Sequence, residues 1–293
     1  MKIKESMGSR IFQASVYIIV GLVMIACLYP FYYIAIVSVS NGMDVMKGLV
    51  KLFPVGLNFE SYKIVLKDPN IGRSYINTIV YTIVGTAGNI LFTTLCAYPL
   101  SRKKFYGRNA FTMMIVFTMF FGGGMIPSYL VVQNLHMINT IWALVLPGAI
   151  STYNMIIMRT FFTGIPESLN ESAYIDGAND IQIFSKIILP LSLPVIATMV
   201  LFYSVDHWNS FFGALLYINE KKKLPLQLVI RNMVIAGDLA DQNASMGAAT
   251  NFVTTDTTIK YALIMVSTLP ILIIYPFVQK YFVKGVMVGS LKG

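Results

Sequence analysis

The chain has 293 residues, of which 56% are hydrophobic and only 12% are charged, and its mean hydropathy is +0.68. Soluble domains carry about 25% charged residues, so this composition excludes an ordinary soluble protein, and the apolar content excludes a disordered one. The net charge of +9 comes from Lys and Arg residues that flank hydrophobic stretches. This placement favours lipid headgroups over nucleic acid as the anionic partner.

Charged residues are absent from five stretches of the chain, at 11–43, 74–101, 109–158, 187–205 and 261–279. A membrane-spanning helix needs about 20 mostly apolar residues, so the stretch at 109–158 holds two spans and each of the others holds one. We predict an all-α integral membrane protein with six transmembrane helices, at about 14–39, 75–100, 110–132, 140–162, 191–217 and 258–282. No polar stretch is long enough for a soluble domain, so residues 1–293 are predicted to form a single transmembrane domain.

Basic residues are densest between the second and third predicted spans, where Arg102, Lys103, Lys104 and Arg108 lie close together. Loops rich in Lys and Arg face the cytoplasm, which places this loop inside. Six spans then place both termini and the segment at 163–190 in the cytoplasm. The two long loops, before the second span and at 218–257, are expected on the opposite side.

The cytoplasmic segment at 163–190 is predicted to form two short helices joined by a turn. Ser168 has the spacing to cap the first helix together with Glu171, and Gly177 supplies the left-handed turn that ends it. Asn179 or Asp180 can cap the second helix. Apolar residues at helical spacing then lead directly into the fifth span, which ties the segment rigidly to the membrane helices. These residues are Ile181, Phe184, Ile187 and Ile188.

The same segment resembles the EAA loop of ABC-importer permeases. The matching residues are Glu171, Ala173, Gly177, Ile187, Leu189 and Pro190, and the departure is Ser172, which stands where the family usually has Ala. The Trp208-Asn209 pair and the ending at 279–285 are similar to the carbohydrate-uptake branch. The run at 153–162 resembles the subgroup that imports oligosaccharides, including alginate or pectin fragments.

This resemblance implies the type I ABC importer fold, with 163–190 as a cytoplasmic helix-turn-helix coupling loop that docks into a cleft of an ATPase. The implied ATPase-coupling residues are Glu171, Ser172, Ala173, Asp176, Gly177, Ile187, Leu189 and Pro190. It further implies a second homologous permease, two ATPase subunits and an extracytoplasmic solute-binding protein in a bacterial cytoplasmic membrane. An amphipathic loop that lies on the lipid headgroups is the alternative interpretation of the segment.

The chain contains no Gly-Lys-Ser/Thr run that could cradle a nucleotide phosphate. We therefore expect ATP and magnesium to be bound by the partner ATPase subunits, and no cofactor to be bound by this chain. Two distant His and two Cys within predicted spans offer no metal site. With no evident nucleophile either, the sequence favours a transport subunit over an enzyme.

The densest polar cluster within a predicted span consists of Asp206, His207, Trp208 and Asn209. Ionisable residues at membrane depth are usually functional, and an indole ring with amide and carboxylate groups suits a sugar, so the cluster is a candidate for the substrate pathway. The alternatives are that Trp208 is an interfacial anchor and that Asp206 pairs with His207 or with a neighbouring helix.

Other polar residues lie within the second and fourth predicted spans. Tyr153 and Asn154 are further candidates for the pathway, while Arg159 is expected to snorkel to the cytoplasmic surface. Asn77 and Asn89 either line the path or join helices through side-chain hydrogen bonds.

We predict a permease subunit of an ATP-driven importer for a carbohydrate, with an oligosaccharide, including an acidic one, as the narrower expectation. Basic residues in the two long outer loops are compatible with an anionic glycan, although anionic lipid explains them as well. The alternative is a secondary transporter or channel subunit that works without an ATPase.

Overall fold

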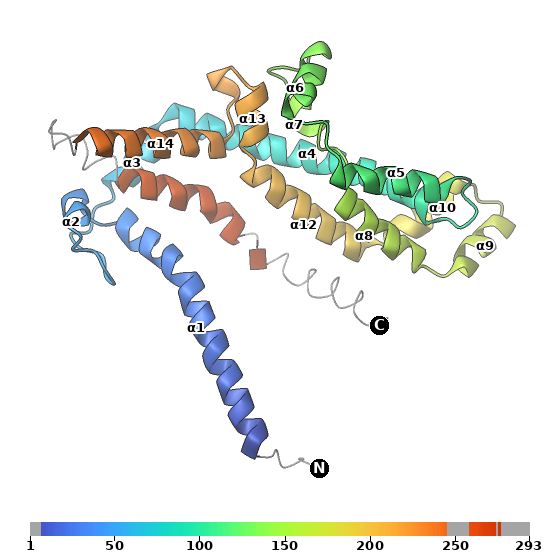
Figure 1. The fold of residues 1–293 in the computed structure, drawn as a ribbon, viewed down its shortest axis with the longest axis horizontal. Helices are drawn as coiled ribbons and strands as arrows, with labels where there is room; N and C mark the ends of the chain where they lie inside the picture. Colours follow the sequence, from blue (N-terminus) through green and yellow to red (C-terminus); the bar gives the residue numbers. More distant parts are fainter. Residues whose placement is uncertain (1–6, 245–257, 274, 277–293) are drawn as a thin grey trace. The chain divides into compact units, whose positions relative to one another are not determined.

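The computed structural model describes residues 7–244, 258–273 and 275–276, and the described chain consists of helices and their connections (Figure 1). It divides into two compact units. One contains Met1–Pro69 and Ile230–Thr268, and the other contains Asn70–Val229 and Leu269–Gly293. All of the sites considered below lie in the second unit.

The first unit begins with the long apolar helix α1 (Met7–Ser38), followed by α2 (Gly42–Met46) and α3 (Glu60–Lys67). Ile36 and Val37, at the end of α1, are buried against Val50. The remainder of α1 exposes its apolar side chains, as expected for a helix that faces lipid or a partner subunit.

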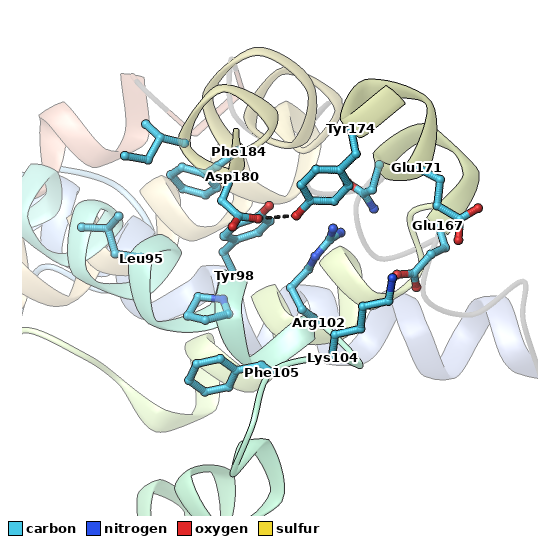
Figure 2. Close-up of a pocket in the computed structure, with 13 residues that line it drawn as sticks. Leu95, Tyr98, Arg102, Lys104, Phe105, Glu167, Glu171, Tyr174, Asp180 and Phe184 are labelled. Carbon is cyan, nitrogen blue, oxygen red and sulfur yellow. Dashed lines mark hydrogen bonds between the residues drawn. The ribbon is translucent and has the colours of Figure 1, made fainter. Parts of the chain in front are cut away.

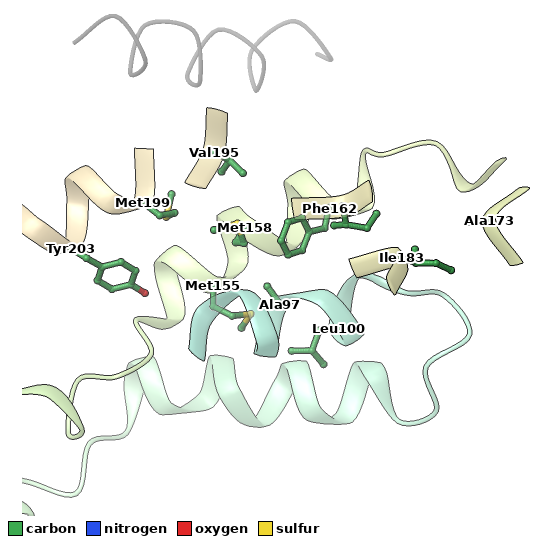
Figure 3. Close-up of a cluster of buried hydrophobic side chains, with 11 residues drawn as sticks. Ala97, Leu100, Met155, Met158, Phe162, Ala173, Ile183, Val195, Met199 and Tyr203 are labelled. Atoms are coloured by element: carbon green, nitrogen blue, oxygen red, sulfur yellow. The ribbon is translucent and has the colours of Figure 1, made fainter. Parts of the chain in front are cut away.

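The second unit is built around α4, α8 and α12. Its elements in chain order are α4 (Pro69–Ser101), α5 (Arg108–Phe120), α6 (Met125–Asn134), α7 (Trp142–Val145), α8 (Thr152–Thr163), α9 (Glu167–Ile175), α10 (Asp180–Ile183), a π-helix (Phe184–Ile188), α11 (Leu189–Leu191), α12 (Leu193–Asn209), α13 (Phe212–Tyr217), a 3-10 turn (Lys221–Lys223) and the start of α14 (Leu226–Ala244). Figure 3 shows Met155 and Met158 of α8 between side chains of the neighbouring elements. Both methionines are fully buried, so α8 lies at the centre of the core.

The predicted third span is not one straight helix. It divides into α5 and α6, which meet at an angle of 115°. Three consecutive glycines separate them, and Gly124 has φ 86 and ψ 167, a conformation that only glycine adopts readily. Three residues without side chains also provide nothing that would stabilise a helix against neighbours, so the break falls there.

The fourth and fifth predicted spans are also interrupted. In the fourth, Pro147 and Gly148 stop the chain from continuing as a helix, and α8 begins only after Ser151, whose side chain caps it. The fifth begins at a 79° bend at Ser192, between Pro190 and Pro194, and its helix α12 ends at Asn209 before α13 starts at Phe212. Proline removes a backbone donor and crowds the preceding turn, which explains the bend.

Two described helices, α1 and α4, are long and apolar enough to cross a membrane, or up to four spans form if each bent pair counts as one. The last apolar helix is described over Thr258–Ile273, and the end of the predicted sixth span lies outside the described residues. The number of six spans therefore stays a prediction. So does the contribution of 279–285, which also lies outside the described residues.

The expectation of a loop throughout 218–257 was wrong, because α14 occupies Leu226–Ala244. Leu226 and Leu228 are buried, and Leu228 packs with Ala214 and Ile218 beyond the end of α12. The short apolar run that begins at Leu226 is thus the buried face of a helix.

The conformation of Gly124 leads to a test of the break between α5 and α6. Gly124→Ala should lower the stability of the protein by about 1–3 kcal/mol, because an alanine is strained in this backbone region. Thermal unfolding in detergent measures the change. Gly123→Ala is the control, since Gly123 has no positive φ and a Cβ there would meet open space. Equal melting temperatures for the two variants would contradict this explanation of the break.

Candidate coupling and translocation sites

The segment at 163–190 contains two helices and a turn, in the arrangement that the sequence predicts. α9 ends at Ile175, and Gly177 adopts a left-handed conformation with φ 80. The amide of Ala178 then donates a hydrogen bond of 2.9 Å to the carbonyl of Ala173, which closes the C-terminus of the helix. Asn179 caps α10 through a reciprocal capping box with Gln182.

The predicted cap of the first helix was wrong. Pro166 occupies the N-cap position of α9 and provides no side-chain hydrogen bond, so Ser168 lies within the first turn rather than before it. Pro166 has φ -55 and ψ 130, and the fixed φ of proline suits the entry into a helix. Glu167 then starts the helix earlier than a cap at Ser168 would allow.

The candidate coupling residues divide into a buried and an exposed group. Ala173 is 7% exposed and belongs to the same core as Met155 and Met199. Glu171, Ser172, Asp176 and Gly177 are exposed. The serine that departs from the family pattern therefore disturbs no packing, and the small residue that the packing requires is Ala173.

The second half of the segment enters α12 through a π-helix. Ile188 is 2% exposed and lies in the core, while Ile187 and Leu189 are partly buried and Pro190 is exposed. The predicted apolar stripe was wrong at Ile181, which is 77% exposed, and the buried position is Ile183 instead. A π-turn has a wider hydrogen-bond spacing than an α-turn, which changes the register of the buried face.

A cavity of about 490 Å³ lies between the end of α4, the segment that follows it, and the helices α9 and α10 (Figure 2). Across its upper side the hydroxyl of Tyr174 donates a hydrogen bond to the carboxylate of Asp180. This hydrogen bond raises the pKa of Tyr174 above its ordinary value, and burial adds to the effect. The contact joins α9 to α10 beyond the Gly177 turn.

The four side chains of the candidate pathway cluster at the end of α12 do not face one common surface. His207 points toward α4, where its Nε2 lies 2.6 Å from Oδ1 of Asn89. Trp208 is 8% exposed, and its ring meets the edge of Tyr75 with 5.8 Å between ring centres. Asp206 and Asn209 are exposed, and Asn209 bonds to the backbone of its own helix. Successive helical residues point about 100° apart, so the four side chains diverge.

Asn89 joins α4 to two other segments through hydrogen bonds, and we call this set of contacts the polar tie of Asn89. Its Nδ2 donates to the carbonyls of Gly148 at 2.7 Å and Ala149 at 2.9 Å, both in the interrupted part of the fourth predicted span. Its Oδ1 faces His207, so every polar atom of the buried amide is occupied. Asn77 similarly donates to the carbonyls of Lys222 and Leu224. The expectation that these asparagines join helices is confirmed.

The contact between Asn89 and His207 requires the imidazole ring to lie very close to the backbone of α4. A Cβ on Gly85 would lie 2.4 Å from Nε2 of His207, so only glycine leaves room for the imidazole. Next to it, the hydroxyl of Tyr203 lies 2.7 Å from that of Thr93 and accepts a hydrogen bond of 3.2 Å from the amide of Ser151. α4, the interrupted segment and α12 are therefore held together by polar contacts.

The other polar residues of the fourth predicted span have different surroundings. Tyr153 is 61% exposed and Asn154 is 7% exposed, so the two pathway candidates on α8 do not face the same way. Arg159 donates from Nε to the carbonyl of Leu100 at 2.9 Å and so caps the end of α4. Snorkelling of Arg159 stays a prediction, and the structure adds this hydrogen bond, which the sequence did not suggest. The signal that sequence reasoning missed is the carbonyls left free where α4 ends.

No group of His, Cys, Asp and Glu suited to a metal ion occurs among the described residues. The described part of the chain offers side chains that position helices and a loop with an exposed acidic face. It presents no constellation of a nucleophile with a base.

The fit between Gly85 and His207 predicts a non-additive pair of mutations. Gly85→Ala alone should lower the free energy of unfolding by about 1–3 kcal/mol, because it displaces the imidazole and leaves Oδ1 of Asn89 without a partner. In the double variant with His207→Ala, the added methyl group occupies the space that the ring vacates, so Gly85→Ala should cost much less. Gly88→Ala is the control on the same helix, where a Cβ meets Val145 at an acceptable 3.4 Å. Strictly additive shifts in thermal unfolding would disprove the contact.

The sequence matches a family model described as "Binding-protein-dependent transport system inner membrane component" over residues 89–288. Protein LplC of Bacillus subtilis (strain 168) is 44% identical, with 98% of this chain and 96% of LplC aligned. The polygalacturonan/rhamnogalacturonan transport system permease protein YtcP of the same organism is 40% identical, with 98% of this chain and 100% of YtcP aligned.

The fold also resembles a chain from the crystal structure of a bacterial ABC transporter involved in the import of the acidic polysaccharide alginate. The TM-score is 0.85 at 35% sequence identity, and the match covers 96% of this chain and 100% of that chain. The match thus extends over nearly the whole protein. This chain belongs to the family of binding-protein-dependent transport system inner membrane components, and it is a permease subunit of an ABC importer rather than an enzyme.

Proposed function

We propose that this permease translocates an oligosaccharide, and that segment 163–190 is the cytoplasmic loop through which a separate ATPase drives it. The observation that carries the proposal is the attachment of this loop to the core. Ala173, Ile183 and Ile188 are buried in the same cluster as Met155 and Met199 of the membrane helices. A movement of the loop must therefore displace α8 and α12, because a packed core transmits strain.

The exposed face of the loop is the proposed docking surface for the ATPase. Glu171 and Asp176 present carboxylates there, next to the small residues Ser172 and Gly177, and no apolar cluster covers them. An acidic face of this kind suits a basic cleft on the partner. A loop that merely lies on anionic headgroups would be expected to expose basic residues.

We further propose the partners that the family architecture implies. These are a second homologous permease, two ATPase subunits that bind ATP and magnesium, and an extracytoplasmic binding protein that delivers the substrate. Both termini and segment 163–190 then lie in the cytoplasm. The chain contributes binding and movement, and the ATPase subunits supply the hydrolysis.

The coupling role predicts a loss of communication in Glu171→Ala. In the assembled complex in liposomes, stimulation of ATP hydrolysis by binding protein and substrate should fall about fivefold or more, because an exposed carboxylate of the docking surface is lost. Ser168→Ala, also exposed on α9, is the matched control and should retain stimulation. Full stimulation with Glu171→Ala, or uptake that proceeds without any ATPase, would overturn the proposal. The second outcome would favour a secondary transporter or channel.

For the substrate we propose an acidic oligosaccharide. The relatives named for polygalacturonan/rhamnogalacturonan and for the acidic polysaccharide alginate support this class. In the structure, Lys223 is engaged by Glu220 at 2.9 Å and by the carbonyl of Asn139. Lys221 and Lys222 are exposed on the same turn, so their charges are available to an anion. The acidic and polar residues at Asp206, Asn209 and Tyr153 remain the proposed hydrogen-bonding groups of the pathway.

Charge selection can be tested with the double variant Lys221→Gln and Lys222→Gln. Uptake of an anionic oligosaccharide should fall about fivefold relative to a neutral one of equal length, because the attraction of exposed charges amounts to about 1 kcal/mol at most. Competition uptake in liposomes at low and high salt measures the ratio, and Lys103→Gln is the control for charge removal. An unchanged ratio at low salt would argue against an electrostatic role of this turn.

A further inference from the structure

Five side chains meet where the end of α4 lies against the loop at 163–190, and we call them the α4 clasp: Tyr98, Arg102, Tyr174, Asp180 and Phe184. Tyr98 lies on the last turns of α4, and its ring centre is 4.8 Å from that of Phe184 in the π-helix. The same ring meets Phe162 of α8 edge-on at 6.4 Å. The aromatic half of the clasp thus brings three elements together.

Arg102 forms the polar half. Its guanidinium carbon lies 5.6 Å from the ring centre of Tyr98, the geometry of a cation–π contact. Figure 2 shows the guanidinium group reaching from the end of α4 toward Tyr174, whose hydroxyl is bonded to Asp180. The hydrogen bond to Asp180 is the main cause that raises the pKa of Tyr174, and the positive charge of Arg102 opposes that shift. The guanidinium of Arg102 is therefore directed toward the ring whose hydroxyl Asp180 binds.

The clasp gives the loop a connection to the membrane helices that does not follow the chain. Along the chain, the loop continues through the π-helix and α11 and meets α12 at the 79° bend. The two prolines that flank Ser192 account for this bend, so the route along the chain changes direction before it enters α12. Through the clasp, by contrast, the loop reaches α4, which continues as one helix from Pro69 to Ser101 with Pro99 only in its last turn.

α4 carries the polar tie of Asn89 as well as the clasp. Asn89 contacts the interrupted fourth span and His207 of α12, so a displacement of α4 would also displace these two segments. Tyr98 and Asn89 are nine positions apart on the same helix, and no proline or glycine that could bend the helix lies between them. Helix α4 therefore connects the α4 clasp to the polar tie of Asn89.

We propose that the α4 clasp is a second, lateral route by which the coupling loop moves the membrane helices, and that Arg102 is its positioning residue. This inference rests on the proposed function. Arg102 touches neither substrate nor nucleotide and acts by holding the loop at a fixed angle to α4. Its planar group can stack on Tyr98 and at the same time direct N–H groups toward Tyr174, which a lysine ammonium cannot do.

The test uses the complete complex in liposomes, with ATPase subunits and binding protein. Uptake and ATP hydrolysis are measured in the same preparation, so that the number of substrate molecules moved per ATP is obtained. Arg102→Gln should lower this ratio about fivefold or more, while the complex assembles and still hydrolyses ATP. Arg102→Lys should restore only part of the ratio. Lys103→Gln removes the same charge from the next, exposed position and should leave the ratio unchanged.

Tyr174→Phe provides an independent measurement, because it removes only a hydroxyl from an exposed ring. It should lower the ratio by itself, and the double variant with Arg102→Gln should be no worse than Arg102→Gln alone. If Arg102→Gln prevents assembly, Tyr174→Phe tests the same path. A wild-type ratio in Tyr174→Phe and in any assembled Arg102→Gln complex overturns the inference.

The two proposals fail in different ways. If Glu171→Ala loses stimulation while the clasp variants keep the wild-type ratio, the loop is the coupling element but the lateral route is not used. If the wild-type complex shows no stimulated hydrolysis, the proposed function itself is wrong. A ratio that falls equally in Lys103→Gln would assign the effect to surface charge and would also overturn the role of the clasp.

Discussion

The structure depends on the need to satisfy backbone carbonyls where apolar helices are interrupted. Asn89 meets that need at the centre of the second unit, because its amide serves the carbonyls of Gly148 and Ala149 and still bonds to His207. In an apolar environment an unpaired carbonyl is costly, so an interrupted helix persists only beside such a partner. Arg159 plays the same part at the end of α4.

The hydrogen bonds of Asn89 and Arg159 and the core around α8 join segments that are distant in sequence, so these segments move together. Met155 and Met158 are enclosed by residues of α4, α12 and the loop at 163–190 (Figure 3). A loop with both an exposed acidic face and a buried alanine is suited to receive force on one side and pass it on at the other. The oligosaccharide importer that we propose needs such a connection, because this permease has to draw its energy from a separate subunit.

Much of the loop was predictable because its signals are local. The left-handed turn at Gly177 and the cap at Asn179 follow from the conformational freedom of glycine and the short side chain of asparagine. The cap at Ser168 failed because Pro166 starts the helix earlier. The cluster at 206–209 was predicted as a candidate for the substrate pathway, and its members meet different neighbours, which only the packing of α12 could decide.

The sequence by itself determined that this is an all-α membrane protein, that a helical pair precedes the fifth predicted span, and that the pair resembles the loop of an ABC importer permease. Hydropathy, turn residues and motif spacing are properties of neighbouring positions, so they can be read along the chain. Only the tertiary structure decided that Gly85 makes room for His207 and that Tyr98 packs on Phe184 beneath Arg102. Those contacts depend on how separate helices pack, and an amide or a guanidinium group has no partner until packing supplies one.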